Sequence, residues 1–385
     1  MGKSRLIAIG FLALCGLVIA AVSQGWLRAS APLAIFPTPP PATVDPADAL
    51  MVEVVYSTDK KQWLTEAAAR WEATNPQVGG RPIKVVLRSE GSQSIVSGLT
   101  GGTLKPTAIS PASTLQITQI NAATIENRQN IAQDAQPLVF TPLVIVAFEG
   151  SPADALRADA TLWAMLQQQA SIPDRSQKLL FGQTSPVSSN SGLQTLLLMA
   201  YAYHNKTSGL TPADINNPEF VAWLTTYARN VEKFGESTGT FMTEMIQFGQ
   251  SRYAAAAVYE STAIENINTA INRKLSLRIM YPPANLWSDH PFAVLDAPWV
   301  SADQRDAARQ LRDFLLATEQ QQQAVGFGFR PSAPDVAIDG PDSPFVKYAP
   351  SGVQRDIPVL VADPSAETIE ALLALWRSLE PGLRR

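Results

Sequence analysis

Short apolar runs alternate with amphipathic segments from about residue 49 to the end of the chain. Residues 51–56 are typical of a buried strand, and residues 57–59 can cap a following helix that carries Trp63 and Trp71 on its apolar side. Residues 83–87 predict a second strand, again followed by a polar turn and a short helix. Strands that alternate with helices in this way predict an α/β fold.

The rest of the chain continues the pattern. Residues 137–148 are nearly all apolar and β-branched, as expected of a buried strand. Gln320 to Gln323 are interpreted as a polar helical tail. We expect further strands at residues 254–259, 277–281 and 293–295. We expect further helices at residues 95–99, 115–125, 162–170, 193–201, 219–233, 241–248, 302–318 and 366–379.

Residues 184–192 concentrate hydroxyl and amide side chains on a turn directly before an apolar helix. Leu193, Leu196 and Leu197 have i, i+3, i+4 spacing, so the helix N-terminus, with its unpaired N–H groups and positive dipole end, points into the turn. This arrangement suits an anion or a carboxylate. The alternative is that Ser189 or Asn190 only caps the helix, although four capping-type residues in a row exceed that need.

Similar polar turns follow other predicted strands. They lie at residues 89–94, 110–113 and 259–262. In open parallel sheets, ligands bind beyond the carboxyl ends of the strands. We therefore expect these turns to converge on one cleft.

The N-terminus predicts export. Lys3 and Arg5 precede an almost uninterrupted apolar run over residues 6–22, which places the rest of the chain outside the cytoplasm. Residues 1–31 are either a signal peptide cleaved after Ala31 or a membrane anchor, because the run approaches the length of a membrane span. The proline-rich residues 32–48 are expected to form an extended linker. Lipid attachment at Cys15 is disfavoured, since a leucine precedes the cysteine where a small residue is needed.

The composition of the chain argues against several classes of function. The 385 residues carry a formal net charge of -4 and form no basic stripe, which argues against a nucleic-acid partner. With 46% hydrophobic and 17% charged residues, the chain is globular and long enough for two domains. Its single cysteine, Cys15, lies in the N-terminal apolar segment, so the body has no thiol chemistry or disulfide. A body without cysteine fits an oxidising extracytoplasmic compartment.

The sequence contains no clear motif of catalytic or metal-ligating residues. His204 and His290 are the only histidines and have no metal-ligand spacing, so we expect neither zinc nor any other metal, and no cofactor. Residues 91–95 lack the final glycine of a nucleophile turn, and residues 98–105 fail the spacing of a phosphate loop. We therefore predict no catalytic residues. His204 is interpreted as structural, and His290 as a residue that could orient its loop.

Several segments together resemble bacterial extracellular solute-binding proteins of the periplasmic type II class, in particular the subgroup often fused to a von Willebrand A domain. The chain departs from that subgroup because it ends at Arg385 without such a domain and without its metal-binding D-x-S-x-S sequence. The segments that carry the resemblance are residues 54–64, 106–113, 184–192, 258–261, 290–299 and 326–331.

The resemblance implies an α/β clamshell in which two lobes close on a ligand by hinge motion. Lobe 1 would comprise residues 49–137 and 285–385, and lobe 2 residues 138–284, with crossings near 137–144 and 281–286. Relatives that bind molybdate or sulfate use comparable serine-bearing turns, which favours an oxyanion. Glu260 would instead suit an amine, an amino acid or a cation, with a salt-bridged or solvent-facing carboxylate as the alternative. The implied ligand contacts are Ser57, Thr58, Ser92, Gln93, Ser110, Ser113, Ser188, Ser189, Asn190, Ser191, Tyr259 and Glu260.

Two functions follow from this resemblance. The first is an extracytoplasmic receptor that delivers a small polar solute to the membrane permease of an ABC-type importer. The second is an envelope-tethered sensor or scaffold that keeps the clamshell without transport. In either case the N-terminal segment would provide the contact with the membrane.

Overall fold

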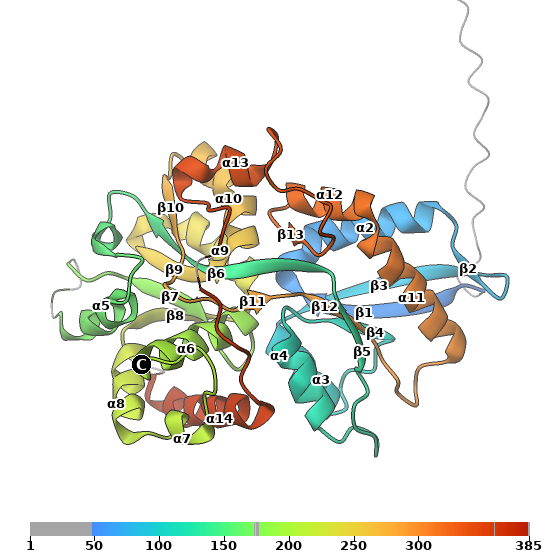
Figure 1. The fold of residues 1–385 in the computed structure, drawn as a ribbon, viewed down its shortest axis with the longest axis horizontal. Helices are drawn as coiled ribbons and strands as arrows, with labels where there is room; N and C mark the ends of the chain where they lie inside the picture. The colour runs from blue at the N-terminus through green and yellow to red at the C-terminus, as the bar shows by residue number, and fades with distance from the viewer. Residues whose placement is uncertain (1–47, 173, 175–176, 358, 384–385) are drawn as a thin grey trace, which may run out of the picture. The chain divides into compact units, whose positions relative to one another are not determined.

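The computed structural model describes residues 48–383 except residues 173, 175, 176 and 358 (Figure 1). The expected export segment, with Cys15, and the linker up to residue 47 lie outside this part of the chain. The described residues form two β-sheets flanked by helices, so the predicted α/β fold is confirmed. Within them, none of the helices combines the length and the apolar character that a membrane crossing requires.

The first sheet has six strands in the order β2-β3-β1-β4-β12-β5. Strand β1 runs parallel to β3 and β4, and β12 is antiparallel to β4 and β5. The strands span Leu50–Ser57 (β1), Gln77–Val78 (β2), Arg81–Glu90 (β3), Ala108–Ser110 (β4), Asp134–Pro137 (β5) and Pro291–Val294 (β12).

Alternating residues of β1 pack into hydrophobic clusters on the two faces of this sheet. Val54 packs with Leu64 and Leu311 of α2 and α11, whereas Val55 packs with Ile95 and Ile117 of α3 and α4. This two-residue period is the geometry of a strand buried on both faces. The four helices span Lys61–Ala73 (α2), Ser92–Thr100 (α3), Thr114–Ala122 (α4) and Ala302–Leu316 (α11).

The second sheet is mixed, with the order β10-β6-β9-β7-β8, and the short strands β11 and β13 also pair with β6. Helices α9 and α10 cover one of its faces, and α5, α6 and α8 contribute to the cluster on the other. Its strands span Val139–Phe148 (β6), Phe181–Thr184 (β7), Val231–Gly235 (β8), Ala255–Tyr259 (β9), Leu277–Met280 (β10), Trp287–Ser288 (β11) and Arg330–Pro331 (β13). The helices span Leu162–Gln168 (α5), Asn190–Tyr203 (α6), Pro218–Ala228 (α8), Thr238–Phe248 (α9) and Glu260–Asn272 (α10).

The chain passes from the first sheet to the second at Leu138, which separates β5 from β6, returns between Met280 and Pro291, and crosses again before β13, which pairs with β6. The C-terminal helix α14, Ala366–Leu383, packs against α6 and α8 and also against α4. Its buried side chains share one hydrophobic cluster with Leu115 of α4 and with α6. The lobe boundaries drawn from the sequence remain a prediction.

Three expectations about individual elements were wrong. The helix expected over residues 219–233 ends at Ala228, and β8 follows at Val231, parallel to β7. Residues 260–272, of which only the polar start was noted, form α10. The glutamine run is helical as expected, within α12, Thr318–Gly326, but it is no polar tail, because the buried Gln321 donates to the carbonyl oxygens of Leu138 and Leu315. For the first of these, pairing of β8 with β7 overrides the local helical periodicity.

Candidate functional site

Six strands end in turns that lead directly to helices: β1, β3 and β4 in the first sheet, and β7, β8 and β9 in the second. We call the region where residues of these turns contact each other the turn junction. Among the expected ligand contacts, only Thr58 is more than marginally exposed. The buried ones are Ser57, Ser92, Gln93, Ser110, Ser113, Ser188, Ser189, Asn190, Ser191, Tyr259 and Glu260.

Turns from the two sheets touch directly in the turn junction. The backbone N–H groups of Gln93 and Ser94, in the first turn of α3, donate to the carbonyl oxygen of Ser188 at 3.0 and 3.3 Å. Nearby, Gln116 Nε2 in α4 donates to Asn190 Oδ1 in α6 at 3.0 Å. The structure therefore brings together residues 92–93 and 188–190, which the sequence placed in opposite lobes.

The serine side chains before α6 bond mainly to other side chains. Ser191 Oγ lies 2.7 Å from both Thr184 Oγ1 and Thr238 Oγ1, and Ser189 Oγ lies 3.2 Å from Thr238 Oγ1. Ser189 occupies the N-cap position without any side-chain capping bond. Asn190 Nδ2 donates to Tyr259 OH at 2.9 Å. Simple capping therefore does not explain this serine-rich turn.

A buried ammonium group that the sequence reading missed lies beneath the first-sheet turns. Lys60 Nζ contacts Ser57 Oγ at 2.5 Å, the carbonyl oxygen of Ser110 at 2.9 Å and His290 Nδ1 at 3.1 Å. Burial lowers the pKa of Lys60 to about 8, against the attraction of the neighbouring Asp59. The available signal was its position, directly after the Ser57-Thr58-Asp59 turn.

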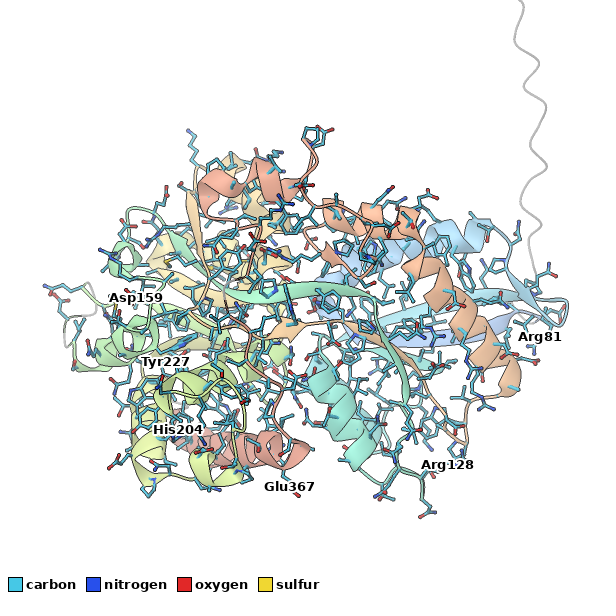
Figure 2. All side chains as sticks on the ribbon, in the orientation of Figure 1. Arg81, Arg128, Asp159, His204, Tyr227 and Glu367 are labelled. Atoms are coloured by element: carbon cyan, nitrogen blue, oxygen red, sulfur yellow. The ribbon has the colours of Figure 1, made fainter. Side chains whose placement is uncertain are left out.

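His290 completes this cluster. Its Nδ1 faces the Lys60 ammonium and must accept, so the proton is assigned to Nε2, which lies 3.4 Å from Asp59 Oδ2. Burial, with the charge of Lys60, holds the pKa of His290 well below its usual value, and burial raises the pKa of Asp59. His290 is thus neutral, and its backbone adopts a φ of 42°. His204, in contrast, lies at the end of α6, 3.0 Å from the carbonyl oxygen of Asp214 (Figure 2).

Glu260 is fully buried, and its carboxylate is matched by protein groups. Arg330 binds both oxygens at 2.8 Å, and the hydroxyl of Tyr281 donates to one of them. A bidentate guanidinium is the strongest common partner of a carboxylate. The negative charge that the sequence reading directed at a ligand is therefore balanced inside the protein.

A pocket of about 860 Å³ lies between α2 on one side and α9 and α10 on the other. Thr58 is the only expected ligand contact among its lining residues. Partial burial, followed by the charge of Asp59, raises the pKa of Glu265 in this pocket to about 7. The lining is mostly polar and includes Gln62, Thr65, Ser89, Thr240, Thr243 and Asn266.

Buried polar atoms without a hydrogen-bond partner gather around the turn junction. Of fifteen such side-chain atoms among the described residues, eight come from the six turns or from residues beside them. A buried polar group left unpaired costs about 1–3 kcal/mol, so each of these atoms has hydrogen-bonding capacity that no described protein group uses. The eight are Gln93 Nε2, Ser110 Oγ, Gln116 Oε1, Ser185 Oγ, Ser261 Oγ and Thr262 Oγ1, together with Asp59 Oδ2 and His290 Nε2, which lie 3.4 Å from each other without meeting hydrogen-bond geometry.

No group of three or more histidine, cysteine, aspartate or glutamate side chains in the described part of the chain is arranged to hold a metal ion. The chemistry that the turn junction offers is hydrogen bonding by hydroxyl, amide and backbone groups. A polar ligand held by such groups requires no covalent step.

The sequence matches one family of known proteins. A family model described as bacterial extracellular solute-binding protein matches residues 52–330. No curated protein sequence matches the chain.

Among solved structures, the sulfate-binding protein SubI from Mycobacterium tuberculosis H37Rv is 19% identical and has a TM-score of 0.53, and the alignment covers 87% of this chain and 99% of SubI. A periplasmic thiamin binding protein is 11% identical with a TM-score of 0.58, covering 88% of this chain and 97% of its own. Iron-bound HitA from Pseudomonas aeruginosa is 15% identical with a TM-score of 0.54, covering 86% and 99%. At these identities the likeness concerns the fold alone.

Proposed function

The chain belongs to the family of bacterial extracellular solute-binding proteins, and on this basis we propose that it holds a small polar solute at the turn junction. Its fold is the two-lobed α/β arrangement of periplasmic binding proteins, as the sequence predicted. The family assignment implies an extracytoplasmic location. The observation that carries the proposal is the gathering of unpaired buried polar atoms around the six turns. We propose no catalytic activity and no cofactor.

We propose that the solute is contacted by the hydroxyl and amide groups of the turns. Glu260 is the exception, because Arg330 and Tyr281 already engage its carboxylate. We assign it a structural role that neither attracts a cation nor repels an anion. The proposed contacts are Ser57, Thr58, Ser92, Gln93, Ser110, Ser113, Ser188, Ser189, Asn190, Ser191 and Tyr259.

The groups at the helix N-termini bear on the charge of the solute. An oxyanion, which the sequence favours, is best held by unpaired N–H groups at helix N-termini. In α3 two of these groups donate to Ser188, and in α4 the N–H of Thr114 donates to the Asp289 carboxylate at 2.7 Å. Because these N–H groups already donate to protein oxygens, they do not favour an anion. A screen should therefore test oxyanions and amines as equal candidates.

We further propose that the protein delivers its solute to the permease of an ABC-type importer, with an N-terminal segment as its contact with the membrane. Neighbouring genes for a permease and an ATPase would support this role. The alternative is a tethered sensor or scaffold that keeps the two-lobed fold without transport.

A thermal-shift screen of oxyanions, amino acids, polyamines and sugars tests the proposal. One class is expected to raise the melting temperature, since a ligand that binds only the native state stabilises it by mass action. Replacing both Ser189 and Asn190 by alanine is expected to abolish the shift. Ser301→Ala, which removes the cap of α11 away from the turns, serves as control and should keep it.

Two results would count against the proposed site. One is the absence of a shift with every class of solute. The other is an unchanged affinity of the best solute for the Ser189→Ala, Asn190→Ala double variant.

A further inference from the structure

The pocket between α2 and the helices α9 and α10 is walled by polar helix faces. Its volume of about 860 Å³ lies in the ordinary range of small-molecule sites. Four of its lining residues form one face of α2 between Lys61 and Glu66, and five form one face of α9 between Gly239 and Gln247. Helices packed directly against each other would present apolar side chains there instead. The two faces therefore suit a polar occupant.

The polar side chains of this pocket bond within their own wall. On α2, Gln62 Nε2 donates to Glu66 Oε1 at 3.2 Å, and on α9, Thr243 Oγ1 donates to the carbonyl oxygen of Gly239 at 3.1 Å. Among the described residues, no hydrogen bond or ion pair joins a lining side chain of α2 to one of α9 or α10. The groups that face each other across the pocket are thus not used to hold the two walls together.

Four charged side chains line the pocket, and two of them already have ionic partners. Glu66 Oε2 lies 3.8 Å from Arg70 Nη1 of the same helix. Glu244 Oε1 of α9 lies 2.5 Å from Lys233 Nζ of β8. These two carboxylates therefore contribute little uncompensated charge to the pocket.

The other two charged side chains have opposite signs and come from opposite walls. Lys61 begins α2, and Glu265 lies in α10. Neither forms an ion pair with another residue in the described part of the chain. Partial burial, followed by the charge of Asp59, raises the pKa of Glu265 to about 7, with no neighbouring cation to counteract it. A cation beside Glu265 and an anion beside Lys61 would each supply a missing partner.

The space around Glu265 continues beyond this pocket. A smaller pocket of about 320 Å³ shares Gln62 and Glu265 with the first. Its lysine, Lys347, lies 5.0 Å from the centroid of the Tyr348 ring and forms no ion pair with Glu265. The Glu265 carboxylate is therefore open to a bound cation from more than one side.

We propose that the solute is a zwitterion whose carboxylate pairs with Lys61 on α2 and whose ammonium group pairs with Glu265 on α10. A simple amine or a simple carboxylate would leave one of the two protein charges unmatched. Thr58 lines the same pocket and connects it to the turn junction. This inference rests on the proposed function, because it takes the protein to be a solute receptor, and it adds the class of the solute and two contacts outside the turns.

The first test uses probes that separate the two charges. The common α-amino acids, β-alanine, γ-aminobutyrate and ε-aminocaproate carry both charges at different separations. Their N-acetyl derivatives keep only the carboxylate, and their amides keep only the ammonium group. At least one zwitterion should raise the melting temperature of the full-length protein more than either of its capped forms does. A set in which no zwitterion acts, or in which a capped form acts as strongly, would overturn the proposal.

Isothermal titration calorimetry with the best zwitterion then tests the two contacts. Lys61→Gln and Glu265→Gln should each weaken binding by about tenfold or more, since each removes one charged partner of the ligand. The control is Glu319→Gln, which removes an exposed carboxylate of α12 outside the pocket and should change the affinity by less than about twofold. Unchanged affinity in either pocket variant would contradict the assigned contact.

Exchange of the two charges gives a readout that a merely structural role would not move. Lys61→Glu or Glu265→Lys alone places two like charges in the pocket and should abolish binding of the zwitterion. The double variant again has one charge of each sign, so it should bind the same zwitterion in the reverse orientation, at least about tenfold more tightly than either single variant. Neither residue belongs to the hydrophobic core, so all three variants should fold. A folded double variant without this recovery would overturn the proposal.

The Ser189→Ala, Asn190→Ala variant separates this proposal from the proposed function. If the best solute is not a zwitterion and depends on Ser189 and Asn190 but not on Lys61 or Glu265, the proposed function stands and the zwitterion assignment is wrong. If a zwitterion depends on Lys61 and Glu265 and binds the Ser189, Asn190 variant with unchanged affinity, the zwitterion assignment stands and the turn before α6 is not part of the site.

Discussion

His290 shows how one side chain can be constrained by its charge state and its backbone together. It is fully buried, it faces Lys60 and Asp59, and its φ is 42°. Burial and the Lys60 charge keep the folded-state pKa of His290 far below the value of about 6.5 expected in the unfolded chain. The unfolded state therefore binds a proton first as the pH falls, which weakens folding below about pH 6.5.

We predict that His290→Asn removes this pH dependence. Asparagine tolerates a positive φ and does not titrate. The difference in unfolding free energy between the wild type and the variant should shrink by about 1.4 kcal/mol per pH unit as the pH falls below about 6.5. Urea unfolding at a series of pH values measures it. A difference that stays constant between about pH 7 and pH 5 would show that His290 is protonated in the folded protein.

The sequence located many of these residues but not their partners. The serine-rich turns could be recognised, because hydroxyl side chains before an apolar helix form a local pattern. The Arg330 that neutralises Glu260 lies far away along the chain, and no local pattern connects the two. Lys60 was overlooked for a similar reason, since its burial depends on His290 and on the Ser110 backbone.

At the scale of elements, the C-terminal helix α14 is predicted to contribute to the stability of the hydrophobic core. Trp376 is fully buried and packs edge-on against Phe234, with 5.0 Å between ring centroids. Trp376→Ala should lower the free energy of unfolding by about 3–5 kcal/mol. Trp376→Phe should cost less, because it keeps a ring and removes the indole N–H, which has no partner.

Urea unfolding followed by circular dichroism compares the two Trp376 variants. Losses in both variants that are no larger than that of an exposed-site control would mean that α14 contributes little packing through this ring. Leu360→Ala, at a residue that is 45% exposed, is the control and should change stability by less than about 0.5 kcal/mol.

Helices and strands with a clear spacing of apolar residues could be predicted from the sequence. Elements that depend on pairing with a distant strand could not. Strand β1 and helix α2 appear close to their expected bounds, because apolar spacing and a polar turn agree there. Helix α8 was extended too far, since Val231 continues its apolar spacing while pairing with Phe181 places that residue in β8. Helix α10 was missed, because its polar start resembled another turn.

At the scale of the whole molecule, Asn285 ties the return crossing to the rest of the protein. Its side chain accepts from the N–H of Leu143 at 3.0 Å and donates to the carbonyl oxygen of Leu143 at 2.8 Å. Its backbone bonds to Val359 and Val361 of the C-terminal segment. One buried residue thus joins β6, the crossing between the sheets and the C-terminal segment.

We predict that Asn285→Ala lowers the free energy of unfolding by about 2 kcal/mol or more, because it leaves both backbone groups of Leu143 buried without these partners. Asn285→Asp should cost at least as much, since it keeps the bond from the Leu143 N–H but buries a carboxylate against the Leu143 carbonyl oxygen. Urea unfolding ranks the three proteins. An alanine variant as stable as the wild type would contradict this role for Asn285.

The overall architecture could be predicted to a large extent, because the order of strands, helices and polar turns is local information. The contacts between turns of the two sheets could not be predicted in this way, because they join residues that are far apart in the sequence. Ser188 was expected to face a ligand, yet its carbonyl oxygen contacts α3.

The pairing of β6 also determines when the second sheet can form. Strand β6 ends at Phe148, and the first of its partners along the chain, β9, begins only at Ala255, followed by β10, β11 and β13. Such non-local pairing gives a high contact order, which slows folding. A nascent chain therefore cannot complete this sheet until most of it has been synthesised, and β6 waits without its partner strands for the synthesis of more than a hundred residues.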